Sequence, residues 1–518
     1  MGRIVFMTNI DRQCVMLEKA RSQLVEEGHL PNEGSVVFLS DSMIWNADWQ
    51  QRFADSDIVL FSWMGMGRDT CFLKQGTEFL RNNKITHAML ATEVHPEDTL
   101  GGVTPKDRNT MRQYLSYSGI ENYRNFWLWL NSQYCQELCT CKPPQQLLWN
   151  GIFHPRADKI FTDIEEYRRL YCQPERATVG IIFPRDEWIW ADLTYQTELI
   201  QEIEAKGLNV IAVFSHWARN VELNAPGVND SVNAFFYEQG MAAIDVLINT
   251  FKFSLTVGKP VDPKFLYNLG VPVLQAYVLL RSREAWQNSI EGLTPMEISC
   301  NIAMPEFDGV IHAVPIAGKE QMPDGTTKYQ ILPERIKRVA AKAAKWANLR
   351  RKANSEKKIA IIFHNYPATN SHIGNAQGLD SPASIRLLLE RLAERGYQVD
   401  SIPPDSRALM DSLLSAATND RCFLSEAMVE QAPGKVTSEQ YRQWFNVLEP
   451  GTQAQLSKDW GKPPGDVFNY EGKLVVPGML NGNIFITVQP PRGFGEDPGK
   501  LYHSPDCAPT HHYLAYYH

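Results

Sequence analysis

The stretch TVGIIFP at Thr178–Pro184, followed further on by GLNVIAVF at Gly207–Phe214, decides the fold class. Both are short apolar runs rich in β-branched residues, and the segment 193–206 between them has the length of a helix. A strand, a helix and a second strand in this order predict a βαβ unit with two parallel strands. Gly207 suits the end of that helix, where a left-handed cap costs glycine little.

The same order of elements returns in the third part of the chain. KIAIIFHNYP at Lys358–Pro367 predicts a strand, Ser384–Arg395 predicts a helix, and GYQVDSIP at Gly396–Pro403 predicts a second strand. Each of these two units therefore resembles a building block of a nucleotide-binding fold. In such folds ligands lie beyond the carboxyl ends of the strands.

The N-terminal region also alternates short apolar runs with stretches of helix length. RIVFMT at Arg3–Thr8 predicts a strand, and Val15–Glu27 predicts a polar helix. Further strands are predicted at Val36–Leu39, Asp57–Phe61 and His87–Thr92. The aromatic-rich stretch Tyr114–Leu130 predicts one buried helix.

These patterns together predict an α/β protein of several domains, with parallel sheets of flavodoxin or Rossmann type and helices on both faces. A length of 518 residues allows about two to four domains. We expect an N-terminal α/β domain at 1–150 and a central α/β domain at 151–332. A basic helix at 333–358, without a continuous apolar face, is expected to link them to a third, loop-rich α/β domain at 359–518.

Composition excludes several classes of protein. Hydrophobic residues make up 44% and charged residues 21%, which is typical of a globular chain and not of a disordered one. The formal net charge of −8 offers no basic excess to attract nucleic acid. The apolar run at Val271–Leu280 falls well short of the roughly 18 residues that span a bilayer. Without a signal-peptide pattern, and with nine cysteines, we expect a reducing, cytoplasmic setting.

Common signature motifs are absent from the sequence. No G-x-x-x-x-G-K-[S/T] occurs, so the chain has no phosphate-binding P-loop, and no H-E-x-x-H or paired C-x-x-C is present. Cys135, Cys139 and Cys141 lie close together, with Cys172 as a distant fourth. They could hold zinc or an iron–sulfur cluster, but ordinary thiols are the simpler interpretation.

The stretch Gln489–His518 has the strongest local signal for chemistry. Imidazoles and carboxylates recur there among prolines, glycines and aromatics, at Glu496, Asp497, His503, Asp506, His511 and His512. Both groups can bind a borderline divalent metal, and both can accept a proton. The alternative is a solvated acidic loop followed by a helix that Thr510 or Asp506 caps.

A second polar cluster lies at Phe363–Asp380, just after a predicted strand. His364 and His372 flank it, and Asn365, Tyr366 and Asn370 lie between them. This is the position at which α/β folds hold ligands. Asp380 followed by Ser381 and Pro382 is typical of the start of a helix. A structural role for the two histidines remains the alternative.

Several motifs in a fixed order resemble the large subunit of cobaltochelatase, in the CobN/magnesium chelatase H-subunit family. They are YLSYSGIENYRN (114–125), GKPVDPKFLYNLGVPVLQAY (258–277), GLTPMEISCNIAMPEFDGVIHAVPIAG (292–318), HNYP with IGNAQGLDSPAS (364–384), DWGKPPG (459–465) and QPPRGFGEDP with PTHHYLAYY (489–517). The spelling PPRGFGEDP is similar to the cobalt branch. The resemblance runs from about Tyr114 to the end, and the family's usual length makes an N-terminal portion or a shortened form the expectation.

The resemblance implies a metal–nitrogen ligase: insertion of Co2+ into a corrinoid precursor, hydrogenobyrinic acid a,c-diamide. Separate AAA+ ATPase and von Willebrand-type subunits would be the partners, and the AAA+ subunit would hydrolyse ATP. Insertion requires the removal of pyrrole protons, the delivery of a stripped metal ion and a cleft that grips the macrocycle. Two alternatives stay open: a magnesium chelatase H-type porphyrin subunit using Mg2+, and a tetrapyrrole-binding or dechelating protein without ATP-driven insertion.

The resemblance also implies roles for single residues. Glu496 is expected to accept a proton or transfer the metal, with His511 and His512 as catalytic or metal-binding groups. His503 and Asp506 are further expected metal ligands. Arg492 would bind a carboxylate of the tetrapyrrole, and the remaining expected substrate-binding residues are Gln489, His364, Asn365, Tyr366 and His372.

Overall fold

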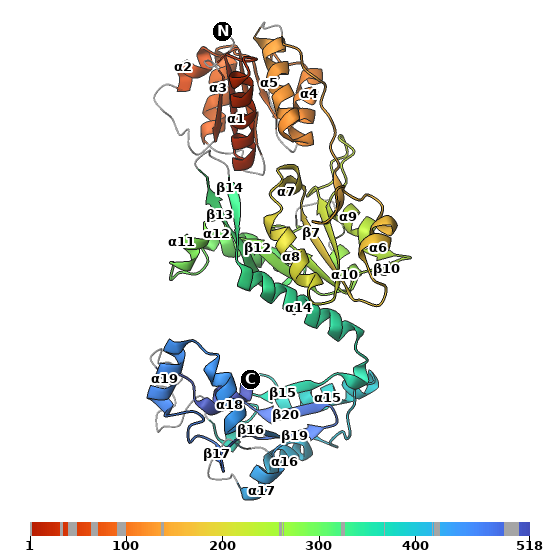
Figure 1. Cartoon of the computed structure of the whole chain (residues 1–518), viewed down its shortest axis with the longest axis vertical. Helices are drawn as coiled ribbons and strands as arrows, with labels where there is room; N and C mark the ends of the chain where they lie inside the picture. Colours follow the sequence, from red (N-terminus) through yellow and green to blue (C-terminus); the bar gives the residue numbers. More distant parts are fainter. Residues whose placement is uncertain are drawn as a thin grey trace. The chain divides into compact units, whose positions relative to one another are not determined.

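Parallel β-strands form the centre of both parts of the chain in the computed structural model (Figure 1). Two compact units are distinguished, Met1–Arg350 and Arg351–His518. The structure describes residues 3–31, 35–39, 49–63, 71–90, 100–135, 139–257, 262, 264–322, 327–366, 368–416, 418, 425–491 and 507–518. The α/β fold class with parallel sheets is confirmed. Domain boundaries at residues 150, 332 and 358 stay a prediction.

The first sheet has five strands in the order β2-β1-β3-β4-β5, with β5 antiparallel to β4 and the other pairs parallel. Its strands are β1 (Ile4–Thr8), β2 (Val36–Leu39), β3 (Ile58–Ser62), β4 (His87–Met89) and β5 (Leu100–Gly101). Helices cover both faces: α1 (Asp11–Glu26), α4 (Pro105–Tyr117) and α5 (Ile120–Tyr134) on one, α2 (Trp49–Ala54) and α3 (Cys71–Asn82) on the other.

The single helix expected at 114–130 is wrong, because two helices meet there. The backbone turns at Ser118 and Gly119, whose φ angles are 62° and 91°, and α5 starts at the next residue. Positive φ angles cannot continue an α-helix. The aromatic residues of α5 still form part of the core, as expected, with Phe126 and Trp127 fully buried.

The second sheet has seven strands in the order β14-β13-β12-β11-β7-β8-β6, and its two edge strands are antiparallel to their neighbours. Its strands are β6 (Asn150–Phe153), β7 (Thr178–Pro184), β8 (Asn209–Ser215), β11 (Val246–Asn249), β12 (Val273–Val278), β13 (Ile311–Gln321) and β14 (Thr327–Ile331). The βαβ unit predicted at 178–214 is confirmed, because β7 and β8 are parallel and α8 (Thr194–Glu204) joins them.

Helices lie on both faces of this sheet too. One face carries α8 and α14 (Pro333–Arg351), and the other carries α6 (Ile164–Tyr171), α9 (Val228–Phe235) and α10 (Phe265–Leu269). Shorter elements of this region are α7 (Arg185–Ile189), a β9 (Tyr237–Glu238) and β10 (Met241–Ala242) hairpin, α11 (Arg283–Gln287), α12 (Pro295–Ile298), a π-helix (Ser299–Ala303) and α13 (Met304–Glu306).

The basic helix expected at 333–358 exists as α14, but the expectation that it lacks a continuous apolar face is wrong. Its buried residues recur with the period of a helix and pack on the seven-stranded sheet: Ile336, Val339, Ala340, Ala343 and Ala347. Three of the five are alanines, whose small side chains make the apolar face of α14 narrow, and charged residues occupy much of the rest of the helix surface.

The second unit contains two small sheets. One has the order β15-β20-β19, built from β15 (Ile359–Phe363), β19 (Gly478–Asn481) and β20 (Ile484–Val488); the other has the order β16-β18-β17, built from β16 (Gly434–Thr437), β17 (Asn469–Tyr470) and β18 (Lys473–Val476). The helices are α15 (Ser381–Glu394), α16 (Ser406–Ala416), α17 (Glu426–Gln431), α18 (Ser438–Asn446), α19 (Pro450–Trp460) and α21 (His511–Tyr517), with 3-10 turns at Asn354–Glu356 and Asn370–His372. Asp380 caps α15, as predicted, by accepting a hydrogen bond from Ala383 N at 3.0 Å.

The strand predicted at Gly396–Pro403 is wrong. The parallel neighbour of β15 is β20, which lies far along the chain. Backbone groups of 396–403 bond instead to the β19–β20 turn: Asn481 Oδ1 accepts from Asp400 N and Ser401 N, both at 2.9 Å.

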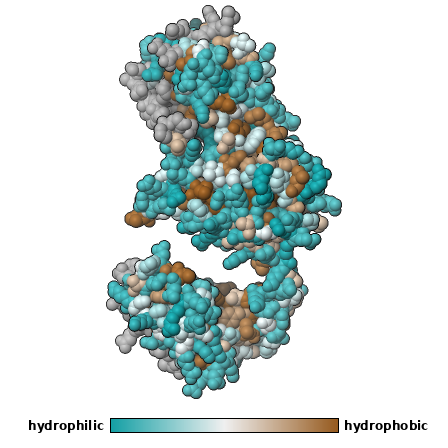
Figure 2. Space-filling view, viewed as in Figure 1, coloured by the Kyte–Doolittle hydropathy of each residue, from teal (hydrophilic) through white to brown (hydrophobic). Residues whose placement is uncertain are grey.

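No helix among the described residues is long and apolar enough to cross a membrane, and Figure 2 shows hydrophilic residues over most of the visible face of each unit.

Candidate functional site

The carboxyl ends of β15 and β20 lie side by side in the second unit. Phe363 pairs with Val488, and Gln489 N donates a hydrogen bond to Phe363 O at 2.8 Å. His364 and Gln489 therefore leave the sheet from the same edge, which is where α/β sheets bind ligands. His364 is exposed and Gln489 is half-buried.

The loop after β15 folds back on itself. Asn365 is fully buried and forms a β-bridge with Ile373, and Gly374 N donates to His364 O at 2.7 Å. Hydroxyls of Thr369 and Ser371 lie 2.7 and 3.1 Å from Nδ1 of His372, which is half-buried. Tyr366 is half-buried as well. Of the predicted residues in this loop, His364 is the one that is exposed.

The histidine pair at 511–512 begins a short helix, α21. The hydroxyl of Thr510 accepts a hydrogen bond from Tyr513 N at 3.0 Å, so Thr510 is the helix cap, one of the two predicted. His511 and His512 are 1% and 0% exposed. Adjacent residues on a helix point about 100° apart, and the two imidazole rings accordingly have different hydrogen-bond partners.

Both ring nitrogens of His511 have partners. Nε2 donates to Gly461 O at 3.0 Å, and Nδ1 accepts from the hydroxyl of Tyr441 at 2.8 Å. A Cβ at Gly465 would lie 2.8 Å from this ring, and Gly465 has a φ of 70°, so the position requires glycine. Burial lowers the pKa of His511. A catalytic role for His511 would require the loss of one of these two bonds, and it stays a prediction.

His512 keeps one nitrogen without a partner. Nε2 donates to Val475 O at 2.8 Å, while the buried Nδ1 has no hydrogen bond among the described residues. Burial lowers the pKa of His512 to about 4, so the ring is neutral near pH 7. A neutral imidazole with an unused lone pair can ligate a metal ion or accept a proton.

The DWGKPPG motif holds the chain where the described residues resume after 506. The carboxylate of Asp459 accepts from Ala508 N at 2.9 Å, and Trp460 Nε1 donates to Ala508 O at 2.6 Å. Gly461 O, in the same motif, is the acceptor for His511. The sequence of this motif predicts no role for Asp459 or Trp460, and no pattern in the sequence marks Tyr441. The motif's position between two other family motifs was the available signal for Asp459 and Trp460.

Four predicted site residues lie outside the described residues: Arg492, Glu496, His503 and Asp506. The described residues contain no group of three His, Cys, Asp or Glu side chains that could hold a metal ion, and this includes Cys135, Cys139, Cys141 and Cys172. The structure therefore brings together His364 and Gln489 at one edge, and separately connects His511 with the DWGKPPG motif.

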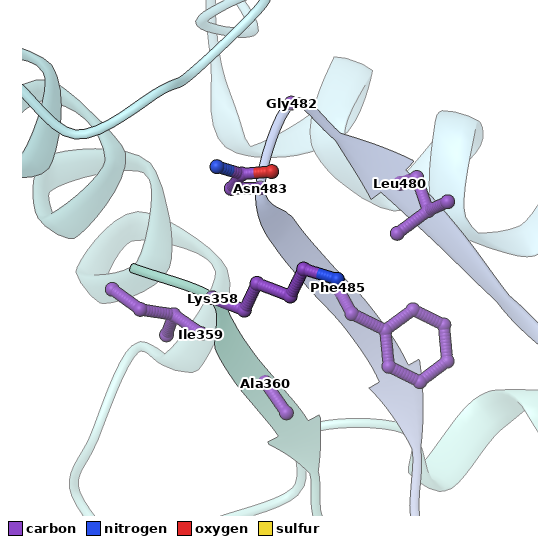
Figure 3. A pocket seen from close by; sticks show the side chains of 7 residues that line it. All are labelled: Lys358, Ile359, Ala360, Leu480, Gly482, Asn483 and Phe485. Carbon is purple, nitrogen blue, oxygen red and sulfur yellow. The ribbon is translucent and has the colours of Figure 1, made fainter. Parts of the chain in front are cut away.

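A cavity of about 340 Å³ lies at the opposite end of the same sheet (Figure 3). Figure 3 shows Leu480 and Phe485 beside it, with the side chain of Lys358 extended toward β20. The other lining residues are Ile359, Ala360, Gly482 and Asn483. Because this cavity lies at the amino ends of β15 and β20, it is not part of the candidate site.

Comparisons with known proteins assign a family. The family model named CobN/Magnesium Chelatase matches residues 112–518. The chain is 40% identical to an uncharacterized protein of Methanocaldococcus jannaschii, over 82% of this chain and 36% of that one. It is 32% identical to the aerobic cobaltochelatase subunit CobN of Pseudomonas aeruginosa, over 81% of this chain and 33% of that one.

A magnesium relative and a solved structure agree with this assignment. The chain is 30% identical to the magnesium-chelatase subunit ChlH of Oryza sativa subsp. indica, over 72% of this chain and 27% of that one. The catalytic subunit of cobaltochelatase from Mycobacterium tuberculosis has the same fold, with a TM-score of 0.62 and 24% identity over all of this chain and 41% of that one. The chain thus spans about a third of the length of these curated relatives, and it belongs to the CobN/magnesium chelatase family.

Proposed function

We propose that this chain forms part of the large, tetrapyrrole-binding subunit of an ATP-dependent metal chelatase. Its substrates would be Co2+ and a corrinoid precursor, hydrogenobyrinic acid a,c-diamide. Membership of the family supports the general activity. The spelling PPRGFGEDP at 490–498 supports cobalt over magnesium.

One observation in the structure carries the proposal: His512 is buried, its ring is neutral near pH 7, and its Nδ1 has no partner within the part of the chain that the structure describes. Insertion needs a group that receives pyrrole protons or holds the incoming ion, and such an imidazole can do either. Asp459 and Trp460 fix the chain at Ala508, three residues before this helix. In the sequence, residues 489–507, which include Glu496, connect the end of β20 to Ala508.

Partner subunits supply the energy in this proposal. The sequence contains no P-loop, so a separate AAA+ ATPase subunit would hydrolyse ATP, and a von Willebrand-type subunit would complete the cytoplasmic complex. The purified chain should therefore show no ATPase activity above a buffer blank. An ATPase rate that copurifies with the chain through further steps would contradict this division of labour.

Macrocycle binding is the direct test. The chain has 13 tryptophans, so titration with hydrogenobyrinic acid a,c-diamide or with protoporphyrin should quench its fluorescence and shift the absorbance of the bound macrocycle. Preferential binding of the corrinoid supports the cobalt assignment. Preferential binding of protoporphyrin would favour a magnesium chelatase H-type subunit. If folded protein binds neither, the proposal is wrong for this chain.

A further inference from the structure

Two buried amides fix the chain where β11 ends, in the first unit. Asn249 Nδ2 donates to Gln275 Oε1 at 2.8 Å, and Gln275 Nε2 donates to Phe251 O at 2.8 Å. Asn249 Oδ1 also accepts from Phe251 N at 3.2 Å. Both amides are 1% exposed. Residue 251 is therefore held just beyond the carboxyl end of β11, beside the middle of β12.

A buried carboxylate fixes the same loop a few residues later. Asp308 accepts from Ser254 Oγ at 2.8 Å, from Leu255 N at 2.6 Å and from Thr256 Oγ1 at 2.5 Å. Asp308 belongs to the MPEFDG part of a family motif. The loop is thus tied down on both sides of residues 252 and 253.

Phe253 connects this loop to the π-helix. Its φ of 60° is strained for a phenylalanine, and its amide donates to Cys300 O at 2.7 Å. Its ring stacks on Trp217, with centroids 5.6 Å apart. Strained backbone persists where the surroundings enforce it, and π-helical turns recur at functional sites.

Lys252 extends from this rigid loop, and among the described residues its ammonium has no carboxylate in direct contact. The structure gives its ammonium no hydrogen bond or ion pair within the described residues, although the side chain is mostly buried. Burial and the neighbouring charge of Lys319 lower the pKa of Lys252 to about 8. The more distant charges of Glu187 and Glu297 partly offset this lowering of the pKa. A buried ammonium without a partner is unfavourable, and a bound anion would relieve that cost.

Asn301 presents a second set of unsatisfied groups, one residue beyond the bond that joins the π-helix to the loop. It is 0% exposed, and neither Oδ1 nor Nδ2 has a hydrogen-bond partner among the described residues. Nearly all buried polar groups in folded proteins are paired, so two unpaired atoms on one amide indicate a missing ligand group. Its free acceptor and free donor match those of a carboxamide.

We propose that the loop after β11 and the π-helix bind a small organic acid that carries both a carboxylate and a carboxamide. Lys252 would pair with the carboxylate, and Asn301 would exchange two hydrogen bonds with the carboxamide. The site lies at the carboxyl ends of parallel strands, where α/β sheets bind ligands. This site is independent of the chelatase proposal, because it uses neither the histidines nor residues 459–518.

Amine labelling of the full chain tests the proposal with defined probes. An amine with a low pKa reacts readily near pH 8, whereas pairing with a carboxylate keeps it protonated and unreactive. Succinamate, which has one carboxylate and one carboxamide, should slow acetylation of Lys252, followed by mass spectrometry. The exposed Lys264 should react at the same rate with and without succinamate. Succinamide and inorganic phosphate should protect Lys252 weakly.

Variants then separate the two contacts. Lys252→Met should weaken succinamate binding, measured by calorimetry, roughly 10- to 100-fold, the loss typical of one charge-assisted hydrogen bond. Asn301→Leu should remove the preference for succinamate over succinate, and Lys264→Met should change nothing. Thermal melts confirm that each variant is folded. Equal protection of Lys252 by phosphate and succinamate, or protection by no probe, would overturn the proposal.

Discussion

The two units each bury a titratable group at a sheet, but they satisfy it in different ways. In the first unit Glu187 accepts hydrogen bonds from Tyr195 and Gln196 at 2.5 Å and from Tyr329 at 3.0 Å. In the second unit the described residues give His512 a single hydrogen bond, to Val475 O, and leave the lone pair of its Nδ1 unused. Three donors on one carboxylate leave no group for a ligand, so Glu187 is structural, whereas His512 remains available for chemistry.

The network around Glu187 also joins the first sheet to the second. Arg12, at the start of α1, lies over the ring of Tyr329 at 5.5 Å and pairs with Asp192 at 3.6 Å. Tyr329 belongs to β14 and Glu187 to α7. Helix α1, which packs on the first sheet, therefore meets α7 and β14 of the region around the second sheet at this network. The polar groups around Glu187 thus help to fix the architecture of the first unit, and we predict that changes to them affect stability and not metal insertion.

The largest expected effect is on metal insertion, in a full-length relative of this chain assembled with its partner subunits. Glu496→Gln keeps the shape of the side chain and removes its charge, so insertion should fall roughly 10²- to 10⁴-fold while macrocycle binding survives. Glu187→Gln is the matched control, because it makes the same change at a saturated carboxylate. Insertion is measured by the absorbance change of the macrocycle. Wild-type rates for Glu496→Gln would refute the role given to this residue.

Acid should destabilise the second unit through His512. Its pKa is 6.5 in an unfolded chain and about 4 in the fold, so the unfolded state binds the proton first as the pH falls. As far as His512 determines it, the free energy of unfolding of the second unit should not change with pH above 6.5 and should fall by about 3 kcal/mol between pH 6.5 and 4. Hydrogen exchange of peptides covering 473–476 and 511–517 measures this loss.

His512→Gln retains a donor for Val475 O and cannot titrate, so it should remove most of that acid-dependent loss. His364→Gln, a change at an exposed histidine of the same unit, should leave the loss intact. An identical acid profile in wild type and His512→Gln would mean that other groups cause it.

The first unit should respond to pH in the opposite direction through Glu187. Burial raises the pKa of Glu187 from 4.5 to about 7, so the folded state holds its proton more tightly than the unfolded state. The contribution of the protonated Glu187 to the free energy of unfolding, about 3 kcal/mol, is fully present below pH 4.5 and is lost as the pH rises through 7. Glu187→Gln should flatten this dependence in exchange of peptides covering 178–200. A wild-type profile in that variant would contradict the assignment.

Local patterns in the sequence predicted local structure correctly. The βαβ unit at 178–214 and the caps at Asp380 and Thr510 depend on residues a few positions apart, and all three are present. The narrow face of α14 was missed because alanines contribute little to an apolar pattern. The strand at 396–403 was predicted wrongly because its alternation of apolar residues is genuine, while its backbone bonds go to the side chain of Asn481.

The candidate site could be predicted only in part, because its decisive contacts join distant segments. Gln489 meets the end of β15 through pairing across more than a hundred residues, and the partners of His511 come from Tyr441 and Gly461. The family resemblance pointed to both histidines and did not indicate which of the two rings has an unpaired nitrogen. Their separation depends on burial and on one unpaired nitrogen, which no sequence pattern encodes.

The smallest expected effect concerns the anchor that the DWGKPPG motif provides. Asp459→Ala removes the acceptor for Ala508 N, and Trp460 still holds Ala508 O, so only one of the two bonds is lost. Asp459 is half-buried, so water can replace its carboxylate in part. The free energy of local opening at 507–518 should therefore fall by about 1 kcal/mol, which corresponds to roughly fivefold faster amide hydrogen exchange there. Asp411→Ala, at an exposed aspartate of α16, is the control and should leave that exchange unchanged. The change should not reach the first unit, whose exchange in 178–200 depends on the network around Glu187. If Asp459→Ala leaves exchange in 507–518 at the wild-type rate, Trp460 alone holds the chain at Ala508, and the carboxylate of the motif must be assigned another purpose.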